Sequence, residues 1–130
     1  MAQQEFQKRL APLLAREKKY KLESYIFISE AVNYAVTSLK ERRHVSASEL
    51  LTSLRDYAFR EYGVISSQVL KDLGIDDAAD VGKLVYLMIE VGLLSSSPED
   101  SPDDFKINFK FYEENAANQG KLSGFPKIDS

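Results

Sequence analysis

Apolar residues recur at intervals of three and four along the first ninety residues, which is the spacing of one face of an α-helix. The longest stripe lies within residues 22–43, where Tyr25, Ile28, Val32 and Ala35 follow one another at this spacing. Similar stripes predict further helices over about residues 3–16, 47–61, 64–73 and 78–91. The pattern therefore predicts five helices in succession.

Residues with known capping preferences mark the ends of these helices. Ser46 and Glu49 have the spacing of a capping box, in which each side chain accepts a hydrogen bond from the other residue's backbone N–H. Gly74 suits the left-handed conformation that ends a helix, and Asp76 and Asp77 can cap the helix that follows. These signals support a boundary before residue 47 and another between the fourth and fifth helices.

After Gly92 the hydrophobic pattern changes to a period of two. The apolar residues Phe105, Ile107, Phe109 and Phe111 alternate with polar ones, as in an amphipathic strand. Residues 93–96 can form its antiparallel partner across a polar turn. We therefore predict a mainly α fold, with five helices followed by a C-terminal two-stranded β-ribbon, in a single domain over residues 1–112. Residues 113–130 are small and polar, and we expect a disordered tail there.

The order of elements over residues 66–111 resembles a winged helix. Residues 66–73 match its scaffold helix, 80–91 its recognition helix and 93–111 its wing. The same residues also fit a helical bundle with an appended hairpin, and both interpretations stay open. A helix that reads DNA needs outward basic side chains, but this one offers only Lys83. We therefore expect binding to duplex DNA to be weak, if it occurs.

A second resemblance covers about residues 20–111 and is to a family of small bacterial proteins of no known activity. Its most distinctive elements are Gly92-Leu93-Leu94 and Asp103-Asp104-Phe105. The other similar segments are residues 43–46, 49–51, 54–58, 82, 84–86 and 100–102. The resemblance implies a bacterial cytoplasmic protein of one domain. It implies no activity.

The composition limits the kinds of site that the chain can carry. Hydrophobic residues make up 44% of the 130 positions, and seven Tyr with seven Phe can fill a core without a structural metal. The sequence contains no cysteine, which excludes a disulfide scaffold, a thiol nucleophile and zinc sites that need sulfur. The most apolar segment, residues 81–94, is too short to span a membrane and contains Lys83 and Glu90. We expect a cytoplasmic protein without a membrane segment.

Charge is unevenly distributed along the chain. Residues 1–44 contain nine Lys and Arg against five Glu, whereas residues 45–130 contain eight Lys and Arg against fifteen Asp and Glu. Such asymmetry can mark a nucleic-acid face or a partner face, and it also fits an ordinary solvated helix surface. The basic stretch from Lys8 to Arg43 is the only plausible surface for nucleic acid.

The sequence shows no constellation that predicts catalysis, metal binding or a cofactor. His44 is the single histidine and is interpreted as a loop residue. The acidic residues Glu99, Asp100, Asp103 and Asp104 could bind a hard cation weakly, act in an enzyme, or shield a hairpin edge as a solvated loop. The glycines are too widely spaced for a phosphate-binding loop.

The fifth helix carries the most informative surface. Its apolar stripe can face the core, while Lys83 and Glu90 lie on the opposite side with Tyr86 and Leu87 between them. Either another helix covers this apolar middle, the second being the candidate, or it anchors a partner protein or a second copy of the chain. We predict a non-enzymatic protein-interaction or regulatory module. The alternative is a winged-helix-like nucleic-acid-binding protein that docks through its basic N-terminal half.

Overall fold

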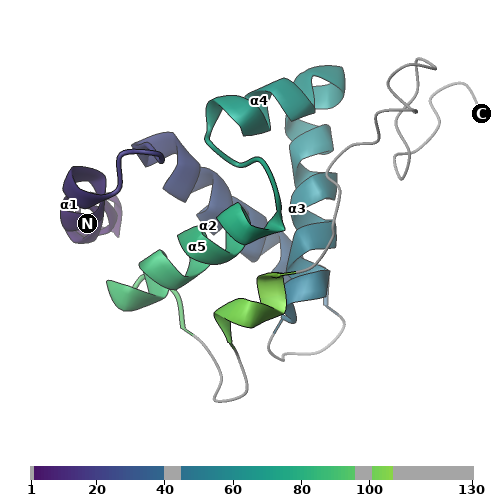
Figure 1. Ribbon diagram of the computed structural model, residues 1–130. Coiled ribbons are helices and arrows are strands. Elements are labelled where there is room, and N and C mark those ends of the chain that lie inside the picture. Colours follow the sequence, from purple (N-terminus) through teal and green to yellow (C-terminus); the bar gives the residue numbers. More distant parts are fainter. Residues whose placement is uncertain (1, 40–44, 96–100, 107–130) are drawn as a thin grey trace, which may run out of the picture.

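The computed structural model describes residues 2–39, 45–95 and 101–106, and this part of the chain is mainly helical. Its elements are shown in Figure 1. They are α1 (Ala2–Arg16), α2 (Leu22–Thr37), α3 (Ala47–Tyr62), the 3₁₀ helix η1 (Gly63–Ile65), α4 (Ser66–Asp72), α5 (Ala78–Glu90) and the 3₁₀ helix η2 (Pro102–Phe105). The prediction of five successive α-helices is confirmed.

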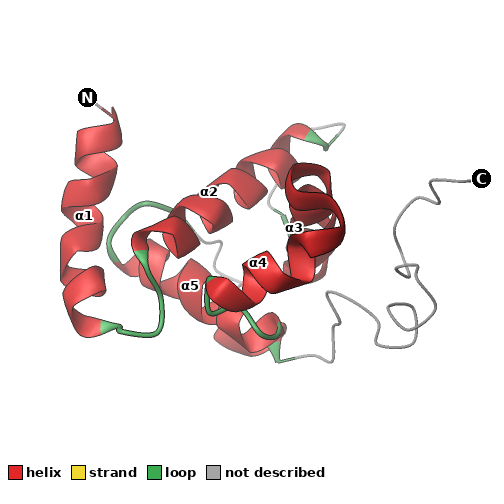
Figure 2. Ribbon diagram, turned by 90° about the horizontal axis from the view of Figure 1, so that it is seen from above, coloured by secondary structure: helices red, strands yellow, loops and turns green. Residues whose placement is uncertain are grey.

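One hydrophobic core joins the helices. α2 and α3 pack side by side, α5 contacts both, and η2 lies against α3 and α5. Tyr25 from α2, Leu54 from α3 and Leu84 from α5 are fully buried in this core. At the edge of the α2–α3 contact the Tyr57 hydroxyl donates a hydrogen bond to Glu30 at 2.9 Å. α1 stands at one side of the molecule (Figure 2), where Leu10 and Leu13 join the same core.

The predicted helix starts are confirmed in detail. The Ser46 hydroxyl accepts a hydrogen bond from the backbone N–H of Glu49 at 3.1 Å, and the Glu49 carboxylate accepts one from the Ser46 N–H at 2.9 Å. Asp77 caps α5 by accepting from the Asp80 N–H at 3.1 Å. Each cap satisfies donors that a helix leaves without partners in its first turn.

α2 ends earlier than the apolar stripe predicts, at Thr37 rather than near residue 43. The hydroxyls of Thr37 and Ser38 donate to the carbonyl oxygen of Tyr34 at 3.1 and 2.8 Å. Such local bonds compete with the regular backbone pattern of a helix. Residues 40–44, which include His44, lie outside the described part.

The predicted β-ribbon is wrong, because the described residues contain no strand. The first of its two strands was expected at residues 93–96, but the Leu93 and Leu94 N–H groups both donate to the carbonyl oxygen of Met88, at 2.8 and 3.3 Å. These amides close the end of α5, as in other helices that end at a left-handed glycine, here Gly92. They are therefore not available for strand pairing.

The start of the second predicted strand is helical as well. The Ser101 hydroxyl accepts from the Asp103 N–H at 3.2 Å, and the Asp104 carboxylate accepts from the Ser101 N–H at 3.1 Å. This capping box, with Pro102 at the first position, favours a helical turn that ends at Phe105. Residues 107–111 of the predicted strand and the predicted tail lie outside the described part. Without a strand pair, the described residues contain no wing, and the winged-helix interpretation is not supported.

Within the described ranges, no helix combines the length and the apolar character that a membrane crossing requires.

Candidate functional site

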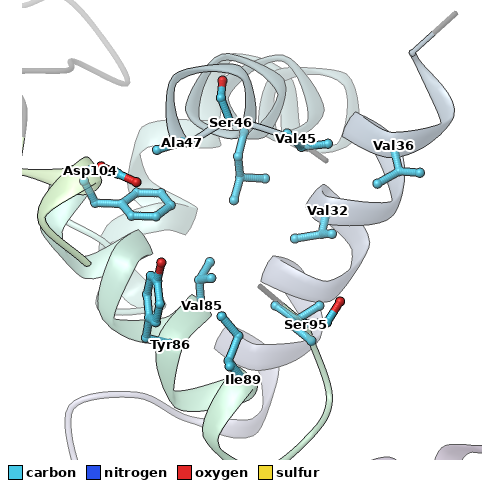
Figure 3. A pocket seen from close by; sticks show the side chains of 13 residues that line it. Val32, Val36, Val45, Ser46, Ala47, Val85, Tyr86, Ile89, Ser95 and Asp104 are labelled. Carbon is cyan, nitrogen blue, oxygen red and sulfur yellow. The ribbon is translucent and has the colours of Figure 1, made fainter. Parts of the chain in front are cut away.

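A pocket of about 180 Å³ opens between α2, α3, α5 and η2. Four valines from three parts of the chain line it, and we call it the valine pocket: Val32, Val36, Val45 and Val85. Figure 3 shows Val32 and Val36 on one side, facing Val85 and Ile89 across the opening. The walls are therefore mainly apolar, with Ser46, Ser95 and Asp104 as polar exceptions.

Helical spacing places most of these side chains. Val32 and Val36 are four residues apart on α2, and Val85 and Ile89 are four apart on α5, so each pair lies on one helix face. Val36 at the mouth remains 47% exposed, although it is a large apolar residue. The described structure thus leaves an apolar surface at the entrance of an apolar pocket.

The polar groups at the rim serve mainly to hold the backbone. Ser46 lines the pocket, but its hydroxyl accepts the cap hydrogen bond at the start of α3. Asp104 also lines it, and one of its carboxylate oxygens accepts from the Ser101 N–H. The pocket is therefore suited to hold an apolar group rather than to perform acid–base chemistry.

The four residues predicted as an interaction surface lie together on α5. Lys83, Tyr86, Leu87 and Glu90 line a shallow depression of about 340 Å³, which we call the outer groove. Ala79, Gly82 and Lys106 complete its lining. Leu87 in its floor is only 8% exposed, so this residue is mostly part of the core.

Segments distant in sequence border the outer groove. Lys83 pairs with Glu17 at 3.4 Å, and Glu90 receives two hydrogen bonds from Arg16 at 3.1 and 3.2 Å. α1 and the residue after it therefore supply the partners of these two charged residues. Both rim charges already have partners within the chain.

Phe105 lines the valine pocket and contacts a residue that lines both depressions. Its ring meets the ring of Tyr86 edge to face, with centroids 6.4 Å apart, and Tyr86 lines both depressions. A Cβ atom on Gly82 would lie 2.6 Å from the Cβ of Phe105, so Phe105 rests directly on the backbone of α5. Sequence reasoning missed this contact, because it placed Phe105 in a strand. The glycine within an otherwise good helix was the available signal.

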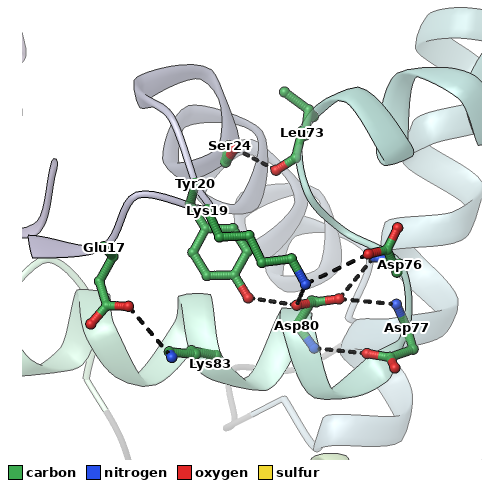
Figure 4. A network of polar contacts seen from close by, with 9 residues as sticks. All are labelled: Glu17, Lys19, Tyr20, Ser24, Leu73, Asp76, Asp77, Asp80 and Lys83. Carbon is green, nitrogen blue, oxygen red and sulfur yellow. Dashed lines mark hydrogen bonds and ion pairs between the residues drawn. The ribbon is translucent and has the colours of Figure 1, made fainter.

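A buried carboxylate fixes the N-terminal end of α5 (Figure 4). Asp80 accepts hydrogen bonds from the Lys19 ammonium at 2.7 Å, the Tyr20 hydroxyl at 2.6 Å and the Asp76 N–H at 2.9 Å. Burial by itself raises the pKa of Asp80, but the hydrogen bonds from Lys19 and Tyr20 outweigh it, and the pKa is lowered. Burial and the same contact raise the pKa of Tyr20. The cluster holds the α1–α2 connection against α5.

The other residues singled out from the sequence do not form a site in the described part. Asp103 pairs with Lys106 at 3.0 Å, and no group of His, Asp and Glu side chains able to hold a metal ion occurs among the described residues. Glu99, Asp100 and His44 lie outside that part. In the basic N-terminal half, Arg9 pairs with Glu5 at 2.7 Å and Lys19 with Asp80, which lowers the positive charge available to nucleic acid.

Comparisons with protein-family models, curated proteins and solved structures find no match for this chain. The geometry of the valine pocket and the outer groove is therefore the basis for assigning a function.

Proposed function

We propose that this chain is a non-enzymatic protein-interaction module that accepts one large apolar side chain of a partner protein in the valine pocket. The observation that carries the proposal is an apolar pocket between three helices whose entrance is formed by the half-exposed Val36. Interfaces commonly derive most of their affinity from a few apolar anchors that enter such pockets.

The size of the pocket supports a single anchor. A cavity of about 150 Å³ is known to hold a benzene ring, so a pocket of about 180 Å³ accommodates one aromatic or branched aliphatic side chain. It is smaller than the pockets of about 300–1,000 Å³ that enclose typical small-molecule ligands. A protein side chain is therefore a better fit than a cofactor.

The outer groove extends the proposed contact surface. Because Tyr86 lines both depressions, a partner seated in the valine pocket would lie beside Lys83 and Glu90. Leu87 is too deeply buried to act as the anchor itself. We assign the anchor role to the pocket and a rim role to the two charged residues, and we place the module in the cytoplasm.

The test compares two substitutions at exposed valines. Val36→Lys places a charge at the entrance of the pocket, at the C-terminal end of α2, where a cation is compatible with the helix dipole. Val64→Lys is the matched control, because Val64 is 74% exposed on η1 and does not line the pocket. Tagged parent and variants are isolated from the native host, and co-purifying proteins are quantified by mass spectrometry.

We expect one or a few proteins to be lost with Val36→Lys and retained with Val64→Lys. Ala47→Leu, which adds volume inside the pocket at a half-buried position, should cause the same loss. If all three variants recover the same proteins in equal amounts, the pocket is not part of the interface. Recovery of nucleic acid in place of protein would favour the alternative function.

A further inference from the structure

The valine pocket lies beside the last described residues of the chain. Asp104 and Phe105 of η2 both line the pocket, and the next residue, Lys106, lines the outer groove. Figure 3 shows Asp104 across the opening from Val32. The residues that follow Lys106 therefore start a short distance from the pocket.

The sequence directly after Lys106 is rich in large apolar side chains. We call residues 107–112 the aromatic segment, because four of its six residues are aromatic or branched aliphatic: Ile107, Phe109, Phe111 and Tyr112. Burial of such side chains away from water is favourable. A nearby apolar pocket with the half-exposed Val36 at its entrance offers a place for one of them.

The length of the connection suits this pocket. A residue spans at most about 3.6 Å, so the four residues from Phe105 to Phe109 can reach roughly 14 Å. That reach exceeds the width of a pocket of about 180 Å³ that Phe105 itself lines. A group attached through a short linker is present at an effective concentration of about a millimolar. Even a weak intrinsic affinity is then enough to fill the pocket.

The segment also matches the pocket in size and charge. A volume of about 180 Å³ holds one phenylalanine ring, as argued above for a partner. Of the described residues that line the pocket, Asp104 alone is charged. The aromatic segment carries Lys110 and no acidic residue. Its docking therefore brings a cation, and no anion, to an acidic rim.

We propose that the aromatic segment occupies the valine pocket of its own chain, with Phe109 as the anchor, and that a partner protein has to displace it. The pocket has room for one such side chain, so the two occupants compete. The competition rests on the proposed function, whereas the occupation of the pocket by the segment does not. A pocket that is free one tenth of the time binds a partner about tenfold more weakly.

The chain contains no tryptophan, so a single introduced one can report on the segment. Phe109→Trp places it at the proposed anchor, and Phe125→Trp is the matched control outside the aromatic segment. Both are measured in the purified 130-residue chain. We expect Phe109→Trp to emit at shorter wavelength than Phe125→Trp and to be quenched less by acrylamide. Its emission should not change on dilution, because the contact lies within one chain.

Substitutions at the two exposed valines show where the segment docks. Val36→Lys places a charge at the entrance of the pocket, and Val64→Lys places one on η1, outside it. Combined with Phe109→Trp, Val36→Lys should shift the emission towards that of Phe125→Trp, and Val64→Lys should leave it unchanged. Ala47→Leu, which fills the pocket from within, should act like Val36→Lys.

A synthetic peptide of residues 106–112 measures the competition. It is labelled and titrated, up to about a millimolar, against the parent and against a variant with both Phe109→Ser and Phe111→Ser. We expect the peptide to bind this variant about tenfold more tightly than the parent, as judged by fluorescence anisotropy. Addition of Val36→Lys to the variant should abolish the binding.

Four outcomes would overturn the proposal. Equal emission and quenching of Phe109→Trp and Phe125→Trp would show that the anchor stays in water. A protected tryptophan that responds to Val64→Lys instead of Val36→Lys would place the segment on η1. One that becomes exposed on dilution would place it on another copy. Equal peptide affinity for parent and variant would show that the parent pocket is empty.

Failure of this proposal and failure of the proposed function give different results. If Val36→Lys removes co-purifying proteins but the tryptophan is exposed, the pocket binds a partner without competition from the segment. If the tryptophan is protected by the pocket but no protein depends on Val36, the segment still occupies the pocket and the proposed function is wrong.

Discussion

The two faces of α5 are buried by different means. The inner face carries Val81, Leu84 and Met88, which are fully buried in the common core, and helices α2 and α3 pack against α5. The outer face carries Lys83, Tyr86, Leu87 and Glu90, and it is bordered by the end of α1 and by η2. Leu87 is nearly as buried as the inner residues, although it lies between two charged positions.

This difference shows which kind of burial a local pattern can reveal. The inner face follows from helical periodicity alone, since its residues recur at three and four. The contacts of the outer face involve residues such as Arg16 and Phe105, which lie far away along the chain. The following predictions test how firmly each part of the outer face belongs to the fold.

The largest effect is expected for Leu87→Asp. A charge at a position that is 8% exposed lacks both water and a partner, so we expect a loss of roughly 3–5 kcal/mol in the free energy of unfolding. Leu84→Asp on the inner face is the reference, and urea denaturation measures both. A Leu87→Asp variant as stable as the parent would show that the outer face is open to solvent.

An intermediate effect is expected for Asp80→Asn, at the N-terminal end of α5. Loss of the charged hydrogen bonds to Lys19 and Tyr20 should cost about 1.5–3 kcal/mol at neutral pH. Because folding lowers the pKa of Asp80 from its ordinary value of 3.8, its carboxylate stabilises the fold above about pH 4. The difference between parent and variant should shrink as the pH falls below that value. Urea denaturation at pH 7 and pH 3 measures the free energy of unfolding of parent and variant. The same difference at both pH values would contradict a lowered pKa of Asp80 in the folded protein.

A smaller effect with a diagnostic sign is expected for Gly82→Ala. The clash with Phe105 should cost about 1–3 kcal/mol, while the better helix propensity of alanine returns about 1 kcal/mol. In a Phe105→Gly background, which removes the Cβ atom together with the ring, the clash disappears, and the same substitution should become stabilising. A double-mutant cycle in urea measures the reversal. Equal effects in both backgrounds would mean that Phe105 does not rest on α5.

The smallest effect is expected for Glu90→Gln. Its ion pair with Arg16 lies at the surface, where such pairs contribute little to stability. The urea midpoint should stay at that of the parent, at low and at high salt. A clear shift would mean that the attachment of α1 depends on this pair more than on Leu10 and Leu13.

The helices could be predicted because their signals are local. The Ser46 and Glu49 box and the cap at Asp77 act within four residues, and both are present as expected. The ribbon prediction failed for a physical reason: alternation from Phe105 onwards indicated a strand, but the Ser101 cap turns the chain into η2. At Phe105, the one described apolar position of the alternating set, these local hydrogen bonds place the chain in a helical turn.

The candidate site could be predicted only in part. The four residues of the proposed surface do lie together, because they share one helix face. The valine pocket was not foreseen, since its lining extends from Val32 to Phe105 and no single segment contains more than a few of its residues. Only packing of three helices and η2 brings them together.

Gly74 has a consequence for the evolution of this chain. Its φ of +80° suits glycine, and a Cβ atom there would also lie 2.9 Å from the carbonyl oxygen of Lys19. Asparagine often replaces glycine where φ is positive. At this position its Cβ atom would still lie too close to the carbonyl oxygen of Lys19. Homologous sequences should therefore keep glycine here even where the core residues around it have been exchanged for others of similar size.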